Sequence, residues 1–487
     1  MQTAYTNMTK IALAVSLAMA LSACTTVGQD FKAPANVADT GFRHAAGAAS
    51  EAQLPTDWWS IYHDETLNRL EQSALRDNPS VKAAGQRLLQ ALAQTNTARA
   101  SDRPRFDAST SVSNSHSSAK TAEGMALGGQ SISGNDVEVG VSMSYEIDLM
   151  GRVKRMIEAS DAQALGAQAD LDGVLLILSS QVASNYWQLR GLDAEMAILN
   201  GALDTRRESL QLVEARFNGG LTNELDLARA KVELANAQAD LYEVKRQRNL
   251  LENSLATLTG KSPATMQLPV VTDPAALPPP PAIPVGLPAS LLAHRPDLIS
   301  SVAGVRAANA QVGVAEGAFY PSLQLTSSFG FASEKLRDLA QGGARQFSVG
   351  PLALSLPIFD GGRNQANLDL SKARYAEAVA NHEGKLLTAL REVEDALSDV
   401  EQRQLQGDAQ AVSQEAAARA YLVARTRYER GISNYLDVTD AQRSSLAADR
   451  AAVQIKTQRL LATVAVARSL GAGWQPEGEL AKLAKAN

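Results

Sequence analysis

The sequence predicts a mostly α-helical chain with a small β part, in which very long helices pair as coiled coils and short two-faced strands pair as a sheet. Three observations predict this fold class. The chain contains an internal repeat of two copies. Each copy has helical stretches longer than an ordinary globular domain, and two segments in which apolar and polar residues alternate. Aromatic residues are only 5% of the chain, and Ala, Leu, Gln, Arg and Glu are abundant, which is typical of long helices.

Residues 1–23 are predicted to be a signal peptide. Lys10 gives a short positive region, and the apolar run Ile11–Leu21 is too short to span a bilayer, which takes about 20 residues. The run leads into Leu-Ser-Ala-Cys, ending at Cys24, which is the only cysteine of the 487 residues. An incidental cysteine is the alternative, but this ending resembles the bacterial lipoprotein box, which implies that Cys24 becomes the acylated N-terminus. Thr25 follows it, where an Asp would resemble an inner-membrane retention signal, so the implied localisation is the outer membrane.

Composition excludes several classes of protein. The net charge is −6, which offers no electrostatic footprint for nucleic acid, so no nucleic-acid partner is expected. The single cysteine excludes a disulfide within one chain. After the signal peptide, no apolar run is long enough for a transmembrane helix. A membrane-spanning chain of this kind must cross as a closed barrel or not cross at all.

An internal repeat divides the chain. Residues 216–226 read against residues 427–437 with a shift of 211, and Gly151-Arg152 aligns with Gly362-Arg363 at the same shift. Ten of the 18 prolines lie from Pro263 to Pro296, a composition that favours extended geometry and a linker. The predicted organisation is an extended N-terminal segment 24–57, a first repeat 58–262, a Pro-rich connector 263–289, a second repeat 290–471 and a tail 472–487.

Each copy is expected to contain the same elements in the same order. A helix of about 25 residues ends near Pro104 or Pro321 and is followed by a strand pair, at 106–147 or 321–359. A long helical hairpin completes the copy. Its first arm runs over 152–218 or 363–430, and at 1.5 Å per residue such an arm reaches roughly 100 Å. Its second arm extends to Thr259 or Leu470.

The four predicted strands each have one apolar and one polar face, as transmembrane barrel strands do. The fourth, 347–359, changes parity near Gly350-Pro351, which predicts a bulge. Two ordinary half-buried hairpins packed on the helices would show the same alternation. If the strands face lipid, four cannot close a barrel, so other copies of the chain must complete it. Closure alone does not choose between two, three or four subunits.

The turns at 218–222 and 429–433 join the arms of the two hairpins. Gly220 and Gly431 suit left-handed helix ends, and Asn223 and Asn434 can cap the next helices. Asp226 and Asp437, three residues after the caps, are interpreted as structural because both copies have them. Asp440 differs, because its counterpart in the first copy is Arg229. In an oligomer Asp440 would form an acidic ring, whereas in isolation it is an exposed acid on a solvated helix.

Together these features resemble the TolC-like outer membrane factors, in particular the lipoprotein branch typified by OprM and NodT. The resemblance rests on the lipoprotein box, the duplicated units, the Pro-rich connector and the Arg-Tyr-x-x-Gly-x-x-x-Tyr-Leu turn. It implies a homotrimer with twelve strands in a β-barrel and twelve helices in a periplasmic tunnel. It also implies a lipid anchor in the outer membrane, a periplasmic adaptor and an inner-membrane pump of the RND type. The implied function is export of small molecules such as drugs or solvents.

The resemblance also implies a gate at the periplasmic end. Residues matching Leu436 and Asp440 form the constriction, and those matching Arg427, Tyr428 and Arg443 make the bonds that hold it shut. One partner is an acid on the neighbouring hairpin, for which Asp193 is the best match, with Glu195 as the alternative. The tips that would meet the adaptor comprise Gly219, Gly220, Leu221, Gly431 and Ile432.

Catalysis is not expected, and neither is a metal or another cofactor. The five histidines are scattered without metal-ligand spacing. Gly260-Lys261-Ser262 resembles the end of a phosphate loop, but the glycine required five residues earlier is Leu255. Two alternatives to the efflux channel are the outlet of a type I protein-secretion system and a structural coiled-coil lipoprotein without a pore.

Overall fold

The computed structural model describes residues 26–33, 42–44, 55–273, 277–281 and 295–471. The predicted signal peptide, Cys24, part of the connector and the tail lie outside these residues. The chain divides into two compact units, each assembled from segments that are distant in sequence. Unit 1 comprises 1–34, 89–166 and 301–381, and unit 2 comprises 35–88, 167–300 and 382–487.

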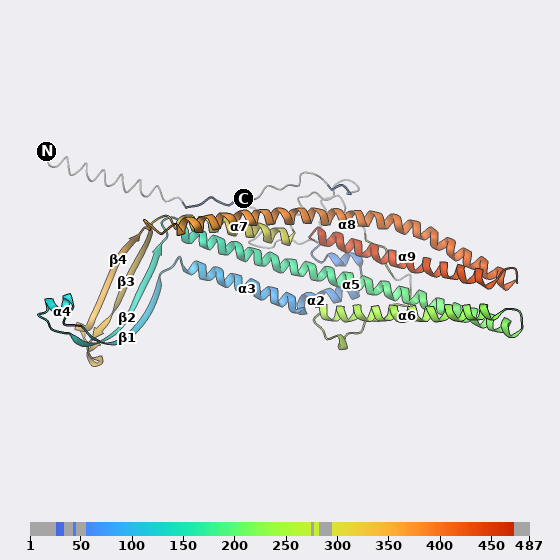
Figure 1. Ribbon diagram of the computed structural model, residues 1–487, viewed down its shortest axis with the longest axis horizontal. Helices are drawn as coiled ribbons and strands as arrows, with labels where there is room; N and C mark the ends of the chain where they lie inside the picture. The colour runs from blue at the N-terminus through green and yellow to red at the C-terminus, as the bar shows by residue number, and fades with distance from the viewer. Residues whose placement is uncertain (1–25, 34–41, 45–54, 274–276, 282–294, 472–487) are drawn as a thin grey trace. The chain divides into compact units, whose positions relative to one another are not determined.

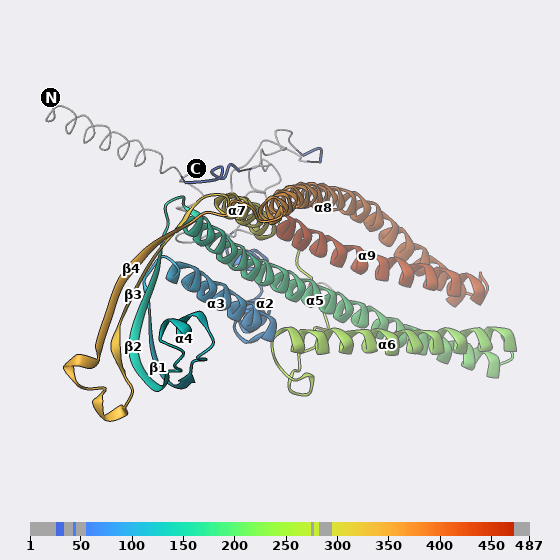
Figure 2. The same cartoon turned by 60° about the vertical axis from the view of Figure 1, so that its left-hand side comes forward.

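The sheet of unit 1 has four antiparallel strands in the order β1-β2-β3-β4, which Figures 1 and 2 show side by side in one layer. The central pairing of β2 with β3 joins the strand pair of the first repeat to that of the second. Within the described residues, β1 and β4 therefore each keep one unpaired edge. The strands are β1 Arg105–His116, β2 Ser133–Ile147, β3 Ser322–Ser333 and β4 Arg345–Ser355.

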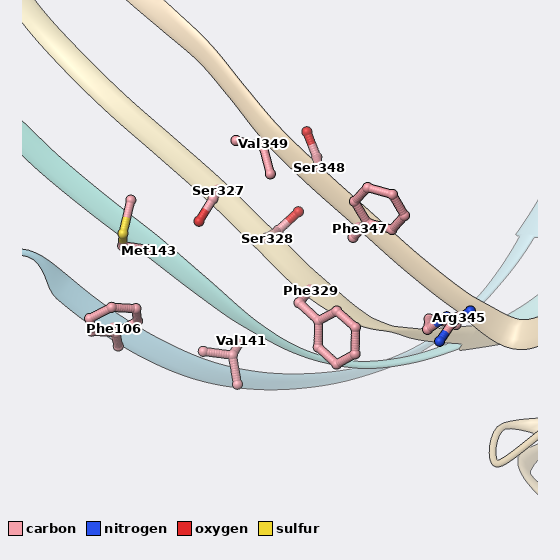
Figure 3. Close-up of a pocket in the computed structure, with 10 residues that line it drawn as sticks. All are labelled: Phe106, Val141, Met143, Ser327, Ser328, Phe329, Arg345, Phe347, Ser348 and Val349. Atoms are coloured by element: carbon pink, nitrogen blue, oxygen red, sulfur yellow. The ribbon is translucent and has the colours of Figure 1, made fainter. Parts of the chain in front are cut away.

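The two faces of this sheet differ sharply. Val141 pairs with Phe329, and Phe329 pairs with Phe347, so these side chains form a row across three strands. Figure 3 shows them beside Phe106 around a shallow apolar depression, and Phe347 is 76% exposed. The alternate residues, mostly serine, glycine and acids, occupy the opposite face. The predicted two-faced strands are thus confirmed, with large apolar side chains left open to the surroundings of the sheet.

The fourth strand is shorter than predicted. The expected bulge is present, because Leu325 pairs with Leu352 while Ser327 pairs with Val349, which leaves Gly350 and Pro351 opposite one residue. Gly350 has a φ of 103°, a conformation that favours glycine. The strand ends at Ser355 instead of residue 359. Pro357 has no backbone N–H to donate to a ladder, which accounts for the early end.

Long helices make up most of the remaining chain, as predicted. The first hairpin arms, α5 and α8, contain 67 residues each, and the second arms, α6 and α9, contain 35 each. No helix in the described ranges is both long and apolar enough to cross a membrane. The main helices are α2 Glu65–Asp77, α3 Pro79–Ala100, α5 Arg152–Asn218, α6 Glu224–Leu258, α7 Pro296–Gly317, α8 Arg363–Glu429 and α9 Tyr435–Ser469. Short helices are η1 Trp58–Tyr62, α4 Ala122–Ala126, η2 Pro263–Thr265, η5 Leu336–Asp338 and η6 Gly342–Ala344.

The hairpin turns form as the sequence predicts. The amide of Leu221 donates to the carbonyl of Arg216, and the amide of Ile432 donates to that of Arg427, which is the Schellman pattern. Gly220 and Gly431 have φ values of 71° and 76°. The side chains of Asn223 and Asn434 then accept amide hydrogen bonds at the starts of α6 and α9. These local bonds reverse the chain at the same place in both repeats.

Unit 2 has several apolar clusters, which hold its helices together. Near α2, the rings of Trp58, Tyr62 and Trp187 are buried in one cluster with Leu67. Further along the first hairpin, leucine and alanine side chains at three and four spacing join α5 to α6. The members of this second cluster are Met196, Leu199, Leu203, Ala237, Leu241 and Val244.

Helix α2 was not predicted as a separate element, and it buries a carboxyl group. Glu71 is fully buried, and neither of its carboxylate oxygens has a hydrogen-bond partner among the described residues. Burial raises the pKa of Glu71 well above 4.5. The folded chain therefore keeps a proton on Glu71 that the unfolded chain releases as the pH rises above that value.

Replacing Glu71 by methionine is expected to stabilise the protein more at pH 7 than at pH 5. From pH 4.5 upward, the protonated Glu71 makes wild-type stability fall by about 1.4 kcal/mol per pH unit, until the pH reaches the raised pKa. Methionine has no proton to hold and fits the apolar surroundings. Thermal unfolding by circular dichroism at both pH values measures the difference. Glu65→Met, on the exposed side of α2, should keep the wild-type pH dependence; an equal effect of Glu71→Met at both pH values would contradict the prediction.

Candidate functional site

The helix ends of the two hairpins meet in a small buried cluster in unit 2. It joins Val213 of α5, Ala230 of α6, Tyr428 of α8, and Tyr435 and Val438 of α9. The rings of Tyr428 and Tyr435 lie 5.4 Å apart, and burial raises the pKa of Tyr435 to about 12. The cluster therefore fixes the ends of all four helices beside the turns where the predicted gate residues lie.

Arg216 ties the first hairpin to the end of α8. Its guanidinium lies 4.3 Å from the centre of the Tyr428 ring and donates to the carbonyls of Tyr428 and Glu429 at 3.2 and 3.1 Å. A cation at the C-terminus of a helix also interacts favourably with the helix dipole. Tyr428, which was predicted to belong to the gate, is thus fixed by contacts to its ring and its carbonyl from a residue of the first repeat.

Glu233 of α6 is the acid that Arg443 meets. Its side chain is 4% exposed, and its Oε1 accepts from Arg443 Nε at 2.7 Å. Its Oε2 lies 3.2 Å from Arg206 Nη2, and Arg206 also donates to the Glu233 carbonyl. Burial, and to a smaller extent the Arg443 cation, lower the pKa of Arg206 despite the neighbouring carboxylate. One carboxylate thus compensates two arginines that belong to different hairpins.

The other predicted gate residues lie on the surface of the tip. Leu436 is 37% exposed, and the Asp440 carboxylate is 62% exposed, 3.9 Å from Arg443. Arg427 is exposed and makes no ion pair with a described residue. At the turns themselves, Leu221 and Ile432 are 79% and 64% exposed. These side chains are available to other chains.

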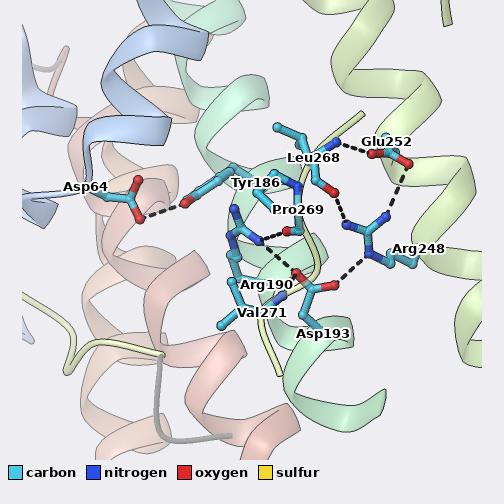
Figure 4. Close-up of polar contacts among 9 residues, drawn as sticks. All are labelled: Asp64, Tyr186, Arg190, Asp193, Arg248, Glu252, Leu268, Pro269 and Val271. Atoms are coloured by element: carbon cyan, nitrogen blue, oxygen red, sulfur yellow. Dashed lines mark hydrogen bonds and ion pairs between the residues drawn. The ribbon is translucent and has the colours of Figure 1, made fainter. Parts of the chain in front are cut away.

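Asp193 lies in a different network, shown in Figure 4. Its Oδ1 accepts from Arg248 at 2.6 Å, and its Oδ2 accepts from Arg190 at 2.8 Å and from the Val271 amide at 3.3 Å. The same arginines donate to the carbonyls of Leu268 and Pro269 in the connector. Asp193 is 1% exposed, and within this chain its contacts fasten the connector to α5 and α6.

Glu195 also has local partners. Its Oε1 accepts from Arg450 Nε at 2.8 Å, and Arg450 bonds Asp240 of α6 at 3.0 Å as well. Neither Asp193 nor Glu195 contacts Arg427, Tyr428 or Arg443 within the described chain. Whether either acid contributes to a gate between subunits stays a prediction.

Glu233 and Arg206 were not among the residues predicted from the sequence. A signal for the first was present, because the buried positions of α6 recur at three and four spacing and include Glu233 and Arg248 among apolar residues. A charged residue in such a row has to be paired inside the protein. The described residues contain no group of three or more potential metal ligands among His, Cys, Asp and Glu.

The two-faced sheet and the paired long helices define a class of channel-forming outer-membrane proteins, and comparison with known proteins places the chain in it. The family model described as outer membrane efflux protein matches residues 70–261 and 287–472. The chain belongs to this family, so the predicted family and its outer-membrane efflux function are confirmed.

Individual relatives agree over almost the whole chain. Outer membrane protein OprJ of Pseudomonas aeruginosa is 34% identical over 95% of this chain and 95% of its own length. Toluene efflux pump outer membrane protein TtgF of Pseudomonas putida is 30% identical over 95% and 96%. Cation efflux system protein CusC of Escherichia coli is 30% identical over 94% and 98%.

Solved structures confirm the fold. The outer-membrane channel OprN superposes with a TM-score of 0.85 at 31% identity, covering 93% of this chain and all of that one. The outer-membrane channel MtrE of Neisseria gonorrhoeae, solved in its open state, gives 0.81 at 28% identity and covers 93% and 99%. This chain therefore has the fold of the outer-membrane efflux channels.

Proposed function

We propose that the chain is one subunit of a homotrimeric channel through which a tripartite efflux system expels small molecules such as drugs or solvents. The observation that carries this proposal is the sheet of unit 1, with an apolar face, a polar face and two unpaired edges. In lipid, unpaired edges cost several kcal/mol for each unsatisfied group. Pairing β4 of one copy with β1 of the next would remove them, and three copies would supply twelve strands.

The proposed partners are a periplasmic adaptor and an inner-membrane pump of the RND type. Exposed apolar side chains at both turns, Leu221 and Ile432, support docking of the adaptor there, together with the neighbouring Gly219, Gly220 and Gly431, whose lack of a side chain leaves the backbone accessible. The relatives' names include a toluene pump and a cation system, which supports substrate choice by the pump. Both of these names are those of efflux systems, which favours the pump over the type I protein-secretion system.

The proposed anchor is an acylated Cys24, and the proposed gate is the tip of the second hairpin. Asp440 and Leu436 would line a constriction, one set from each subunit, with Arg427, Tyr428 and Arg443 holding the hairpin shut. Within a subunit, we propose Glu233 as the acid that Arg443 uses, and Asp193 as an anchor of the connector. An adaptor that prefers the open tip would shift the population toward it.

The double variant Asp440→Ala with Arg427→Ala is expected to leak. Each charge-assisted hydrogen bond contributes about 1.5–3 kcal/mol, so loss of even one should raise the open population roughly tenfold. Conductance of the closed channel, recorded from purified trimers in a planar bilayer, measures this. The control is Asp204→Ala with Arg207→Ala, which removes an exposed ion pair on α5 and should behave as wild type. Unchanged closed-channel conductance in the first variant would reject the gate assignment.

A further inference from the structure

The residues that follow Cys24 are bound to unit 1 by a dense set of polar contacts. The Val27 amide donates to the carbonyl of Met150, which lies between β2 and α5, at 2.9 Å. The carbonyls of Val27 and Gly28 each accept from Arg155 at 3.0 Å, and the Gln29 carbonyl accepts from Asn309 Nδ2 at 2.9 Å. Three consecutive carbonyls of this anchor segment, residues 26–30, are thus bonded to side chains of α5 and α7.

Arg155 depends on the anchor segment as much as the segment depends on Arg155. Its side chain is only 4% exposed, and three of its four bonds go to the segment, to Val27, Gly28 and the Asp30 carboxylate. The fourth goes to Glu158 at 2.7 Å. If the segment left, a buried guanidinium would lose most of its partners, which is costly. The segment therefore supplies the carbonyls and the carboxylate that compensate the buried Arg155 cation.

The backbone contact beneath Arg155 requires glycine at position 28 and leaves little room at position 313. A Cβ on Gly28 would lie 2.7 Å from the Cα of Gly313, and Gly28 has a φ of 87°, which also favours glycine. A Cβ on Gly313 would lie 3.0 Å from Arg155 Cγ. A Cβ on Gly151 would lie 2.5 Å from Thr26. Such close backbone approach is found where two segments pack in one fixed arrangement.

We propose that Arg155, with the Gly28–Gly313 contact, is the positioning residue of the anchor segment and holds residues 26–30 at a fixed point beside the β2–α5 junction. The link to the lipid anchor rests on the proposed acylation of Cys24. Thr26 is two residues from Cys24 in the sequence, so the positioned segment begins almost directly after the proposed acylation site.

A spin label on Gln29→Cys tests the proposal by electron paramagnetic resonance of the full-length trimer in detergent. The Gln29 side chain is exposed, and acylation leaves the introduced cysteine as the one free thiol. The label should be immobilised in the otherwise wild-type chain and should gain a fast-motion component with Arg155→Ala. Arg155→Lys should do the same, because an ammonium lacks the planar fork of donors. Arg99→Ala, which removes an exposed ion pair with Asp161 in unit 1, is the matched control and should leave the label immobile.

Further measurements separate the possible failures. If Arg155→Ala does not form trimers, Asn309→Ala removes one bond to the segment and should give intermediate mobility. A label that is equally mobile, or equally immobile, in wild type and in every variant would overturn the positioning role. Mass spectrometry of the N-terminal peptide reads acylation independently. An immobile label on a chain without the acyl mass would overturn the anchor, whereas a mobile label on an acylated chain would overturn the docking.

Discussion

Replacing Glu233 by alanine is expected to lower the free energy of unfolding by about 3–5 kcal/mol, as loss of one partner from a buried ion pair does, and to raise the conductance of the closed channel. The stability effect arises because Arg206 stays buried without its carboxylate. The conductance effect arises because Arg443 on α9 loses the acid on α6 that holds it. Thermal unfolding and planar-bilayer recording of the same purified trimers measure the two effects.

A second substitution separates the two consequences of losing Glu233. Replacing Glu233 by methionine and Arg206 by leucine removes both buried charges, and such replacements of buried pairs are often neutral or stabilising. This pair of substitutions should restore stability, while Arg443 still lacks its acid and the channel still leaks. The matched control is Glu243→Ala on the same helix, which breaks an exposed pair with Arg246 and an exposed hydrogen bond from Gln247. If the Glu233→Ala channel were stable and did not leak, the proposal that this carboxylate stabilises the closed state would be wrong.

Much of the fold could be predicted because the relevant signals are local. Gly220 and Asn223 end one helix and begin the next through hydrogen bonds that span only a few residues. The repeat doubles each such signal, since Gly431 and Asn434 do the same in the second copy. The long arms between these turns follow from apolar spacing alone. Element ends without a local signal were harder, as the early end of β4 shows.

The candidate site was less predictable because its partners are distant in sequence. Arg443 and Glu233 are separated by 210 positions, and no short-range pattern links them. Gly28 and Gly313 approach each other for reasons that only the packed backbone reveals. The charges buried in the apolar row of α6 did carry a signal, but a row alone does not say which arginine faces which acid.

Asp193 provides the other large expected effect, and it separates two roles for one carboxylate. Replacing Asp193 by alanine leaves Arg190 and Arg248 buried, with the connector carbonyls, Glu252 and the Tyr186 ring as their remaining partners. We expect stability to fall by about 3–5 kcal/mol, with closed-channel conductance unchanged. Because the Val271 amide also loses its acceptor, hydrogen exchange of the connector amides, read by mass spectrometry, should accelerate.

Three acids of α5 that differ in burial provide a graded test of the stability effect expected for Asp193→Ala. Glu195→Ala should cost less than Asp193→Ala, because its partner Arg450 is 30% exposed and keeps Asp240. Asp204→Ala, at an exposed acid of the same helix, should cost almost nothing. If Asp193→Ala instead kept its stability and leaked, Asp193 would be the gate acid between subunits, as the family resemblance implies. The buried bonds of Asp193 to two arginines and a connector amide argue for the structural role, because a carboxylate that released them each time the channel opened would leave Arg190 without an acid and Arg248 with Glu252 alone.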